Sequence, residues 1–184
     1  MLSTTRLSCA FVVLAAASLS FASCNPNFEG HPVSILYADT AGLEELAVAS
    51  DTAGANVITK AVNDLNPEFL VENSGHFPTS YLIKDQANHN LAVFAVQAPR
   101  APPAPKLNTI DNTGKDERQY WLISCDTCNS GVPSGGVFGV GCQIANSYVS
   151  GFCVQQPGVL GQPPILRGCS GGSDQKFNFR REFP

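Results

Sequence analysis

The chain has 184 residues and a formal net charge of −4, with 11 Lys and Arg residues against 15 Asp and Glu residues. This balance argues against nucleic acid and anionic membranes as partners, because both are bound by clustered basic side chains. Only 14% of the residues are charged and Gly and Pro are frequent, which favours short strands over long helices.

The first 23 residues have the composition of a secretory signal peptide. An early arginine precedes an apolar run at residues 9–19, and small residues follow just before Cys24. A membrane-spanning helix needs about 20 apolar residues, so this run is too short, and no comparable run follows. We therefore expect residues 1–23 to be removed and the protein to be secreted without a transmembrane segment. A lipidated Cys24 is the alternative, which the aromatic residue Phe21 disfavours.

Residues 24–184 are long enough for one domain with its own core. Short apolar or alternating segments separated by turns predict an all-β protein. Polar loops with Gly, Asn and Asp, the residues that hairpins require, join the first two strands of each group. In chain order the predicted strands are 33–36, 45–48, 54–59, one starting at Phe69, 81–84, 90–93, 106–110, one starting at Trp121, 142–145, 152–155, 161–166 and one starting at Phe177.

A proline-rich segment at residues 97–106 interrupts this series. Such a run favours polyproline II and could serve as a linker between domains. Neither side of it has enough strands to close a barrel alone. We therefore predict that it is a long loop inside a single domain.

Three aromatic residues recur at nearly constant spacing, since Phe69, Trp121 and Phe177 lie 52 and 56 residues apart. Trp121 ends a Gln-x-Trp triplet that begins at Gln119, and Phe177 ends a Gln-x-Phe copy that begins at Gln175. A period near fifty predicts three units of four strands each. One such unit could not bury its apolar face alone, whereas three packed together can. The three rings are expected to fill the shared core.

This pattern resembles the β-trefoil, and within it the ricin B-type lectin family, in which Gln-x-Trp stands near the end of each repeat. The likeness covers nearly all of residues 24–184 and is strongest in the third repeat. It implies a carbohydrate-binding domain. It also implies a disulfide within the third repeat between Cys153 and Cys169, because that family closes a bond between cysteines at these two positions.

In the ricin B-type family three elements hold the sugar. An Asp accepts hydrogen bonds from sugar hydroxyls, a ring stacks on the apolar sugar face, and an Asn precedes the Gln-x-Trp. No repeat of this chain keeps all three. In the first, second and third repeats, the Asp position is occupied by Ala47, Ala92 and Gln155. The ring position is occupied by Thr59 or Lys60, by Thr109 and by Arg167. The Asn position is occupied by Asn66, Arg118 and Asp174.

We therefore predict a drifted sugar site confined to the third repeat and formed by Gln155, Arg167 and Asp174. Gln155 can donate and accept hydrogen bonds, whereas Ala47 and Ala92 can do neither. Arg167 would add charge-assisted bonds, which suits an acidic or sulfated sugar better than plain galactose. The alternative is that the three polar residues are ordinary solvated side chains.

The even number of cysteines left after signal cleavage indicates disulfides in a secreted chain. The pair Cys125 and Cys128 could also bind zinc or act in redox chemistry, but no suitable ligands or strand–helix context accompany it. Apart from the pair implied by the family, the pairing stays open. The favoured arrangement joins Cys142 to one cysteine of this pair and Cys24 to the other.

No catalytic motif accompanies the scattered histidines His31, His76 and His89, so we expect no enzyme, no cofactor and no metal. The expected partner is a glycan or a secreted or cell-surface protein, bound by a monomer. An alternative function is protease inhibition, as in the β-trefoil inhibitors. Residues 74–80 and 126–136 are the candidate inhibitory loops, since loops held in one conformation lose less entropy on binding.

Overall fold

A computed structural model describes residues 23–62, 67–77, 79–98 and 101–182, so residues 1–22 of the expected signal peptide and Asn66 lie outside it. The described ranges contain strands and two 3₁₀ helical turns, and none of their helices is long and apolar enough to cross a membrane. The elements are β1 (Pro32–Tyr37), β2 (Glu44–Val48), β3 (Val57–Ala61), β4 (Phe69–Asn73), β5 (Ser80–Asp85), β6 (Leu91–Ala98), β7 (Ala101–Thr109), η1 (Glu117–Gln119), β8 (Trp121–Ser124), β9 (Thr127–Cys128), β10 (Val137–Asn146), β11 (Phe152–Gln155), β12 (Ile165–Gly168), η2 (Ser173–Gln175) and β13 (Phe177–Arg181).

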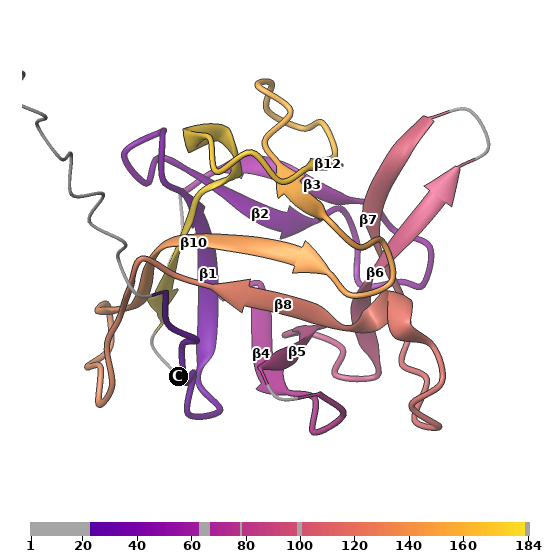
Figure 1. The fold of residues 1–184 in the computed structure, drawn as a ribbon, viewed down its shortest axis with the longest axis horizontal. Coiled ribbons are helices and arrows are strands. Elements are labelled where there is room, and N and C mark those ends of the chain that lie inside the picture. Colours follow the sequence, from indigo (N-terminus) through magenta and orange to yellow (C-terminus); the bar gives the residue numbers. More distant parts are fainter. Residues whose placement is uncertain (1–22, 63–66, 78, 99–100, 183–184) are drawn as a thin grey trace, which may run out of the picture.

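Six strands close into a barrel (Figure 1). Around the ring, β1 pairs with β4, β4 with β5, β5 with β8, β8 with β10, β10 with β13, and β13 with β1, all antiparallel. These are the first and last strands of the three predicted repeats. Closure leaves no unpaired edge in the ring, which is how small all-β domains avoid edge-to-edge association.

The second and third strands of every repeat form a hairpin outside the ring: β2–β3, β6–β7 and β11–β12. The three hairpins meet at one end of the barrel. Gly54 donates to the carbonyl of Leu107, and Thr59 exchanges backbone hydrogen bonds with Gly161 and Gln162. A six-stranded barrel capped by three hairpins is a β-trefoil, so the predicted fold is confirmed.

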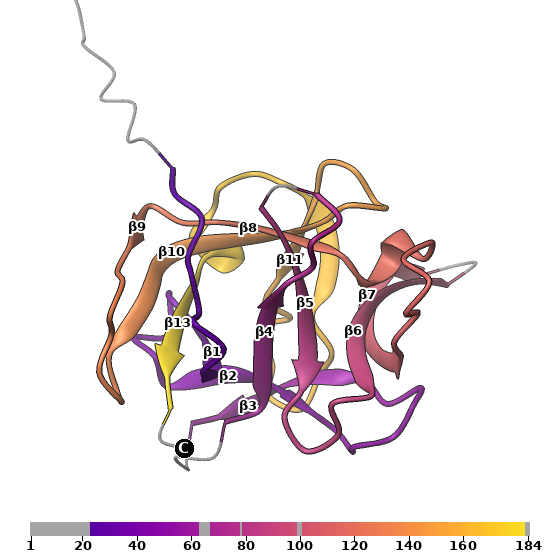
Figure 2. The same ribbon diagram turned by 90° about the horizontal axis from the view of Figure 1, so that it is seen from below.

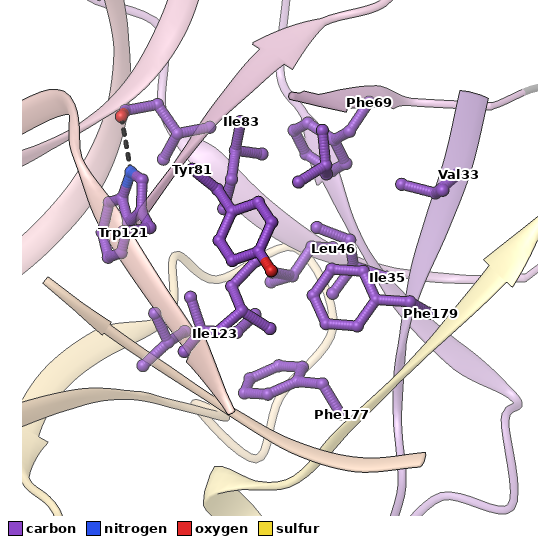
Figure 3. Packing of buried hydrophobic residues seen from close by; sticks show 14 of the residues in the cluster. Val33, Ile35, Leu46, Phe69, Tyr81, Ile83, Trp121, Ile123, Phe177 and Phe179 are labelled. Atoms are coloured by element: carbon purple, nitrogen blue, oxygen red, sulfur yellow. Dashed lines mark hydrogen bonds between the residues drawn. The ribbon is translucent and has the colours of Figure 1, made fainter. Parts of the chain in front are cut away.

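The barrel interior is filled by the predicted aromatic residues (Figure 3). Phe69, Trp121 and Phe177 are fully buried in one hydrophobic cluster. The indole Nε1 of Trp121 donates to the carbonyl of Val93 over 2.8 Å, which satisfies its one polar atom inside the core. Each of the three rings begins the last strand of its repeat. The aromatic residues that recur along the sequence therefore enter the core at equivalent places in the three repeats.

The opposite end of the barrel is closed by the segment that precedes β1, residues 24–30, which we call the N-terminal plug. Phe28 is 2% exposed and packs edge-on against Tyr81 and Phe138, with ring centroids 5.5 and 5.8 Å apart. The Tyr81 hydroxyl donates to the carbonyl of Pro26 over 2.7 Å. The only expectation for this segment was the disulfide of Cys24, and the burial of Phe28 was not predicted.

Two predictions about the strands need correction. The proline-rich segment is not a loop, because Ala101–Thr109 forms β7 and pairs with β6 along most of its length. Figure 2 shows the two strands side by side at one flank of the barrel. β7 has β6 as its ladder partner and lies at the end of the sheet order. Pro102 and Pro103 fall where the β6–β7 register shifts, and proline is tolerated at such irregularities of an edge strand. The short strand β9 was also not predicted, so the described residues form thirteen strands rather than the expected twelve.

Three disulfides connect the described chain. Cys153 bonds Cys169, the pair that the family resemblance implies. Cys125 bonds Cys142 and Cys24 bonds Cys128, which matches the favoured arrangement of the remaining four. The bond between Cys24 and Cys128 holds the N-terminal plug against β9, and it occupies the sulfur that a lipid would need at Cys24.

Candidate functional site

The β11–β12 hairpin carries two of the three predicted sugar-binding residues. Its register pairs Cys153 with Arg167 and Gln155 with Ile165, so Gln155 and Arg167 lie on the same face of the hairpin. Val154 and the residue opposite it, Leu166, are buried and face the core. Strand alternation therefore turns Gln155 and Arg167 away from the barrel.

The third predicted residue, Asp174, is brought to Gln155 by the Gln-x-Phe motif. Gln175 is buried, and its Nε2 donates to the carbonyl of Gly168 over 3.0 Å and to Oε1 of Gln155 over 3.4 Å. Its Oε1 accepts from the backbone N–H of Ser170 over 2.8 Å. The backbone carbonyl of Asp174 accepts from the N–H of Gln156, the residue after Gln155, over 2.9 Å. The 3₁₀ turn and the end of β11 are thus joined side by side.

A glycine leaves room for the Asp174 carboxylate. A Cβ at Gly172 would lie 2.7 Å from Oδ1 of Asp174, closer than a real Cβ approaches, and 3.2 Å from the Oγ of Ser170, which is a tight contact. No side chain caps the turn that begins after Gly172. Among the described residues the carboxylate of Asp174 forms no hydrogen bond or ion pair, so its oxygens are available as acceptors.

The charges around this site are mixed. Arg167 is exposed and forms no ion pair with any described residue. On the side of Asp174 the first repeat adds two carboxylates, Asp39 from the β1–β2 loop and Glu44 from the start of β2. Burial raises the pKa of the Asp39 carboxyl, and the negative charges of Glu44 and Asp174 add to the shift. Oε2 of Glu44 accepts from Nε2 of Gln156 over 2.6 Å.

The sequence did not point to Asp39, Glu44 or Gln156 as members of this site. Asp39 and Glu44 belong to the first repeat, and they reach the third repeat only because the hairpins converge at one end of the barrel. The contact between Gln156 and Glu44 spans 112 residues. No local motif could have indicated it.

The equivalent positions of the other repeats lack this arrangement. Ala47 and Ala92 are buried and offer no polar group. In the first repeat Lys60 is paired with Glu68, and in the second Arg118 is paired with Asp116 at 2.5 Å. Asn66, the expected Asn position of the first repeat, lies outside the described residues.

Strand register corrects one of the sequence equivalences. The ring position lies opposite the residue two places before the Asp position. Arg167 is paired with Cys153 in the third repeat, and Lys60 is paired with Glu45 in the first. In the second repeat the residue opposite Asn90 is Ile110, whose N–H donates to the carbonyl of Asn90 over 3.0 Å. Thr109 instead pairs with Leu91. None of the three positions carries an aromatic ring.

The glutamines of the repeat motif are structural in both repeats that keep them. Gln119 is buried, its Oε1 accepts from the N–H of Asp111 over 3.0 Å, and its Nε2 donates to the carbonyl of the same residue over 2.9 Å. Gln175 bridges its own preceding loop in the same way. The motif therefore fastens the loop before the last strand to the core.

The two loops considered for protease inhibition differ in how they lie against the rest of the protein. In residues 74–80, Oγ of Ser80 accepts from the N–H of Phe77 and donates to its carbonyl, which holds Phe77 at the surface with 45% of it exposed. Residues 126–136 fold back on the body instead, because Val132 is buried in the core cluster and its carbonyl accepts from Arg181.

No group of His, Cys, Asp and Glu side chains that could hold a metal ion occurs in the described part of the chain. The cysteines there are paired in disulfides. The chemistry available at the third repeat is hydrogen bonding by amide, carboxylate and guanidinium groups, which is suited to recognising a polyhydroxylated ligand.

Solved structures of other proteins share the fold. The chain aligns with a mosquitocidal holotoxin at a TM-score of 0.62 and 13% identity, over 84% of this chain but only 17% of the toxin. A Polyporus squamosus lectin bound to the epitope Neu5Acα2-6Galβ1-4GlcNAc aligns at 0.55 and 19% identity, over 84% of this chain and 50% of the lectin. The β-trefoil BEL aligns at 0.55 and 13% identity, over 85% and 97% of the two chains.

No model of a known protein family matches the sequence, and no curated protein sequence is similar to it. The chain spans less than a fifth of the holotoxin and half of the lectin. At these identities the structural likeness establishes a β-trefoil fold that this chain shares with lectins.

Proposed function

We propose that the protein is a secreted, non-catalytic carbohydrate-binding module of the ricin B lectin-like kind, with a drifted site in its third repeat. The observation that carries the proposal is a pair of contacts that join the end of β11 to η2. Gln175 donates to Oε1 of Gln155, and the backbone N–H of Gln156 donates to the carbonyl of Asp174. Arg167 extends the same face. Lectin neighbours support glycan binding at the level of the fold, and three disulfides support secretion.

The proposed ligand is a glycan with an acidic group. The carboxylate of Asp174 and the amide of Gln155 would bond sugar hydroxyls, while Arg167 would bond a carboxylate or sulfate. The neighbouring Asp39 and Glu44 repel an anion placed over Asp174, so the acidic group belongs at the Arg167 end. The epitope bound by the Polyporus squamosus lectin, which carries Neu5Ac, is a suitable first probe.

A glycan array on the mature protein, followed by titration of its best ligands, tests this proposal. With no stacking ring, we expect dissociation constants of about 0.1 to 1 mM. The double change Gln155→Ala and Asp174→Ala should abolish measurable binding. Gln97→Ala with Asp51→Ala is the matched control, because it removes one exposed amide and one exposed carboxylate elsewhere. A blank array, or binding that survives the first double change, contradicts the third-repeat site.

Protease inhibition is the second candidate, favoured by one observation. The Ser80 hydroxyl accepts from the N–H of Phe77 and donates to its carbonyl, so Phe77 presents an aromatic side chain from a fixed backbone position. A panel of secreted proteases that cleave after aromatic residues tests it. Inhibition that is lost on Phe77→Ala but kept on Phe152→Ala, another partly exposed phenylalanine, would favour the inhibitor.

A further inference from the structure

The second repeat contains a surface pocket that the third-repeat site does not include. It has a volume of about 380 Å³ and lies where the β5–β6 turn meets the end of β7. Its wall combines amine, imidazole, amide and hydroxyl groups with two aliphatic side chains. The lining residues are Leu82, Lys84, His89, Asn90, Thr109, Ile110 and Asn112.

The polar side chains of this pocket are unusually available. Among the described residues, no hydrogen bond or ion pair involves the imidazole of His89, the amides of Asn90 and Asn112, or the hydroxyl of Thr109. Lys84 has one partner, Glu72, at 2.5 Å, which leaves two of the three ammonium donors unused. The pocket therefore gathers donors and acceptors that the fold itself does not use.

The loop that carries Asn112 is held rigidly. Oδ1 of Asp111 accepts from the N–H and hydroxyl of Thr113, and its Oδ2 accepts from the N–H groups of Lys115 and Asp116. These bonds lower the pKa of the Asp111 carboxyl to about 2, so they persist in neutral solution. The Gln119 side chain holds the same loop from the core side. A ligand that reaches Asn112 would not have to order this loop first.

The composition of the wall selects the ligand. Lys84 and His89 are the titratable groups of the lining. The nearest carboxylate, that of Glu72, lies outside the lining and pairs with one donor of Lys84. Leu82 and Ile110 are half-buried and offer apolar surface for the C–H face of a sugar ring. The remaining groups match ring hydroxyls. A carboxylated saccharide satisfies all of these features together.

We propose that this pocket is a binding site for a carboxylated saccharide, separate from the third-repeat site. The proposal rests on the proposed carbohydrate-binding function and adds a second site for an acidic saccharide. The carboxylate lies toward Lys84 and His89, and the sugar hydroxyls bond the two asparagine amides. A protein with both sites would bind an acidic glycan through two repeats at once.

Amide chemical shifts of the isotope-labelled, disulfide-intact protein test the site. The probes are methyl β-glucuronide, methyl β-glucoside, which carries a hydroxymethyl group in place of the carboxylate, and acetate, each titrated to ~10 mM. We expect the glucuronide to shift His89, Asn90 and Asn112 more than either other probe does. Asn112→Ala and His89→Ala should each weaken that binding about fivefold. Asn56→Ala, an exposed asparagine of the first repeat, should leave it unchanged.

Each result of these titrations tests one part of the proposal. Equal shifts with the glucoside overturn the requirement for a carboxylate, and equal shifts with acetate overturn the saccharide. Glucuronide shifts that occur only around Gln155 and Asp174 overturn the second-repeat pocket while the proposed function stands. The absence of any glucuronide shift also overturns the pocket, and the glycan array then decides the proposed function independently.

Discussion

Gly139 shows how closely single residues are fitted in this core. A Cβ at this position would lie 2.7 Å from the sulfur atoms of both Cys125 and Cys142, which are bonded to each other. We expect Gly139→Ala to lower the free energy of unfolding by about 1–3 kcal/mol, because neither sulfur can move away without shifting its strand. Urea unfolding under non-reducing conditions measures this. Gly168→Ala, where the new methyl group meets no atom within 4 Å, should be nearly neutral.

Glu45 is a carboxylate placed where no hydrogen bond reaches it. Its side chain is 1% exposed, and neither carboxylate oxygen has a hydrogen-bond partner among the described residues. Burial raises the pKa of this carboxyl, although the nearby Lys60 ammonium opposes the shift. The folded state therefore binds this proton more tightly than the unfolded state does. The stability that the protonated form contributes is lost as the pH rises through the folded-state pKa.

Glu45→Gln should consequently make the protein more stable than the parent at neutral pH. The difference should shrink as the pH falls below about 4, where the carboxyl becomes protonated in both states. Thermal unfolding measured across this pH range tests the prediction. The exposed Glu117→Gln provides the control, and a stability difference for Glu45→Gln that does not depend on pH would contradict the argument.

At the scale of elements, the disulfide Cys153–Cys169 ties β11 to the loop before η2 and closes a loop with a sequence separation of 16. Replacing both cysteines by alanine should cost about 3 kcal/mol of unfolding free energy, since the unfolded chain gains freedom. The same change should weaken any glycan binding at Arg167, which pairs with Cys153. Urea unfolding of the double variant measures the cost, and a loss near zero would show that the bond constrains little.

The elements also show what sequence patterns can and cannot predict. The strands that begin with Phe69, Trp121 and Phe177 were predictable because a ring in each repeat must enter the core at the same place. The second half of β7 was predicted as the strand at 106–110, but its first half was not, because that part contains all three prolines of the strand. Gln155 and Asp174 could be proposed together from the repeat alignment. Glu44, which reaches the same site from the first repeat, could not be, because that contact depends on how the hairpins converge.

At the scale of the whole molecule, the N-terminal plug completes the core from outside the three repeats. Phe28 contacts residues of β5, β10 and β13 through Tyr81, Phe138 and Phe179. Phe28→Ala should therefore lower the unfolding free energy by about 3–5 kcal/mol, the usual cost of removing a buried phenylalanine. Phe77→Ala, which removes a ring that is 45% exposed, should cost much less. Similar losses for both variants in thermal unfolding would mean that the plug contributes little.

The pairing of β1 with β13 also has a consequence for the order of events during synthesis. Val33 is paired with Arg181 and Tyr37 with Phe177, so the first strand of the barrel cannot form this pairing until the last strand has been synthesised. The ring cannot close while a ribosome still holds residues 177–181. The first two repeats must meanwhile persist with apolar surface uncovered, and pairings this distant in sequence make folding slow. A nascent chain stalled before residue 177 should therefore be sensitive to protease along its whole length, and the released chain should acquire resistance in a single late step.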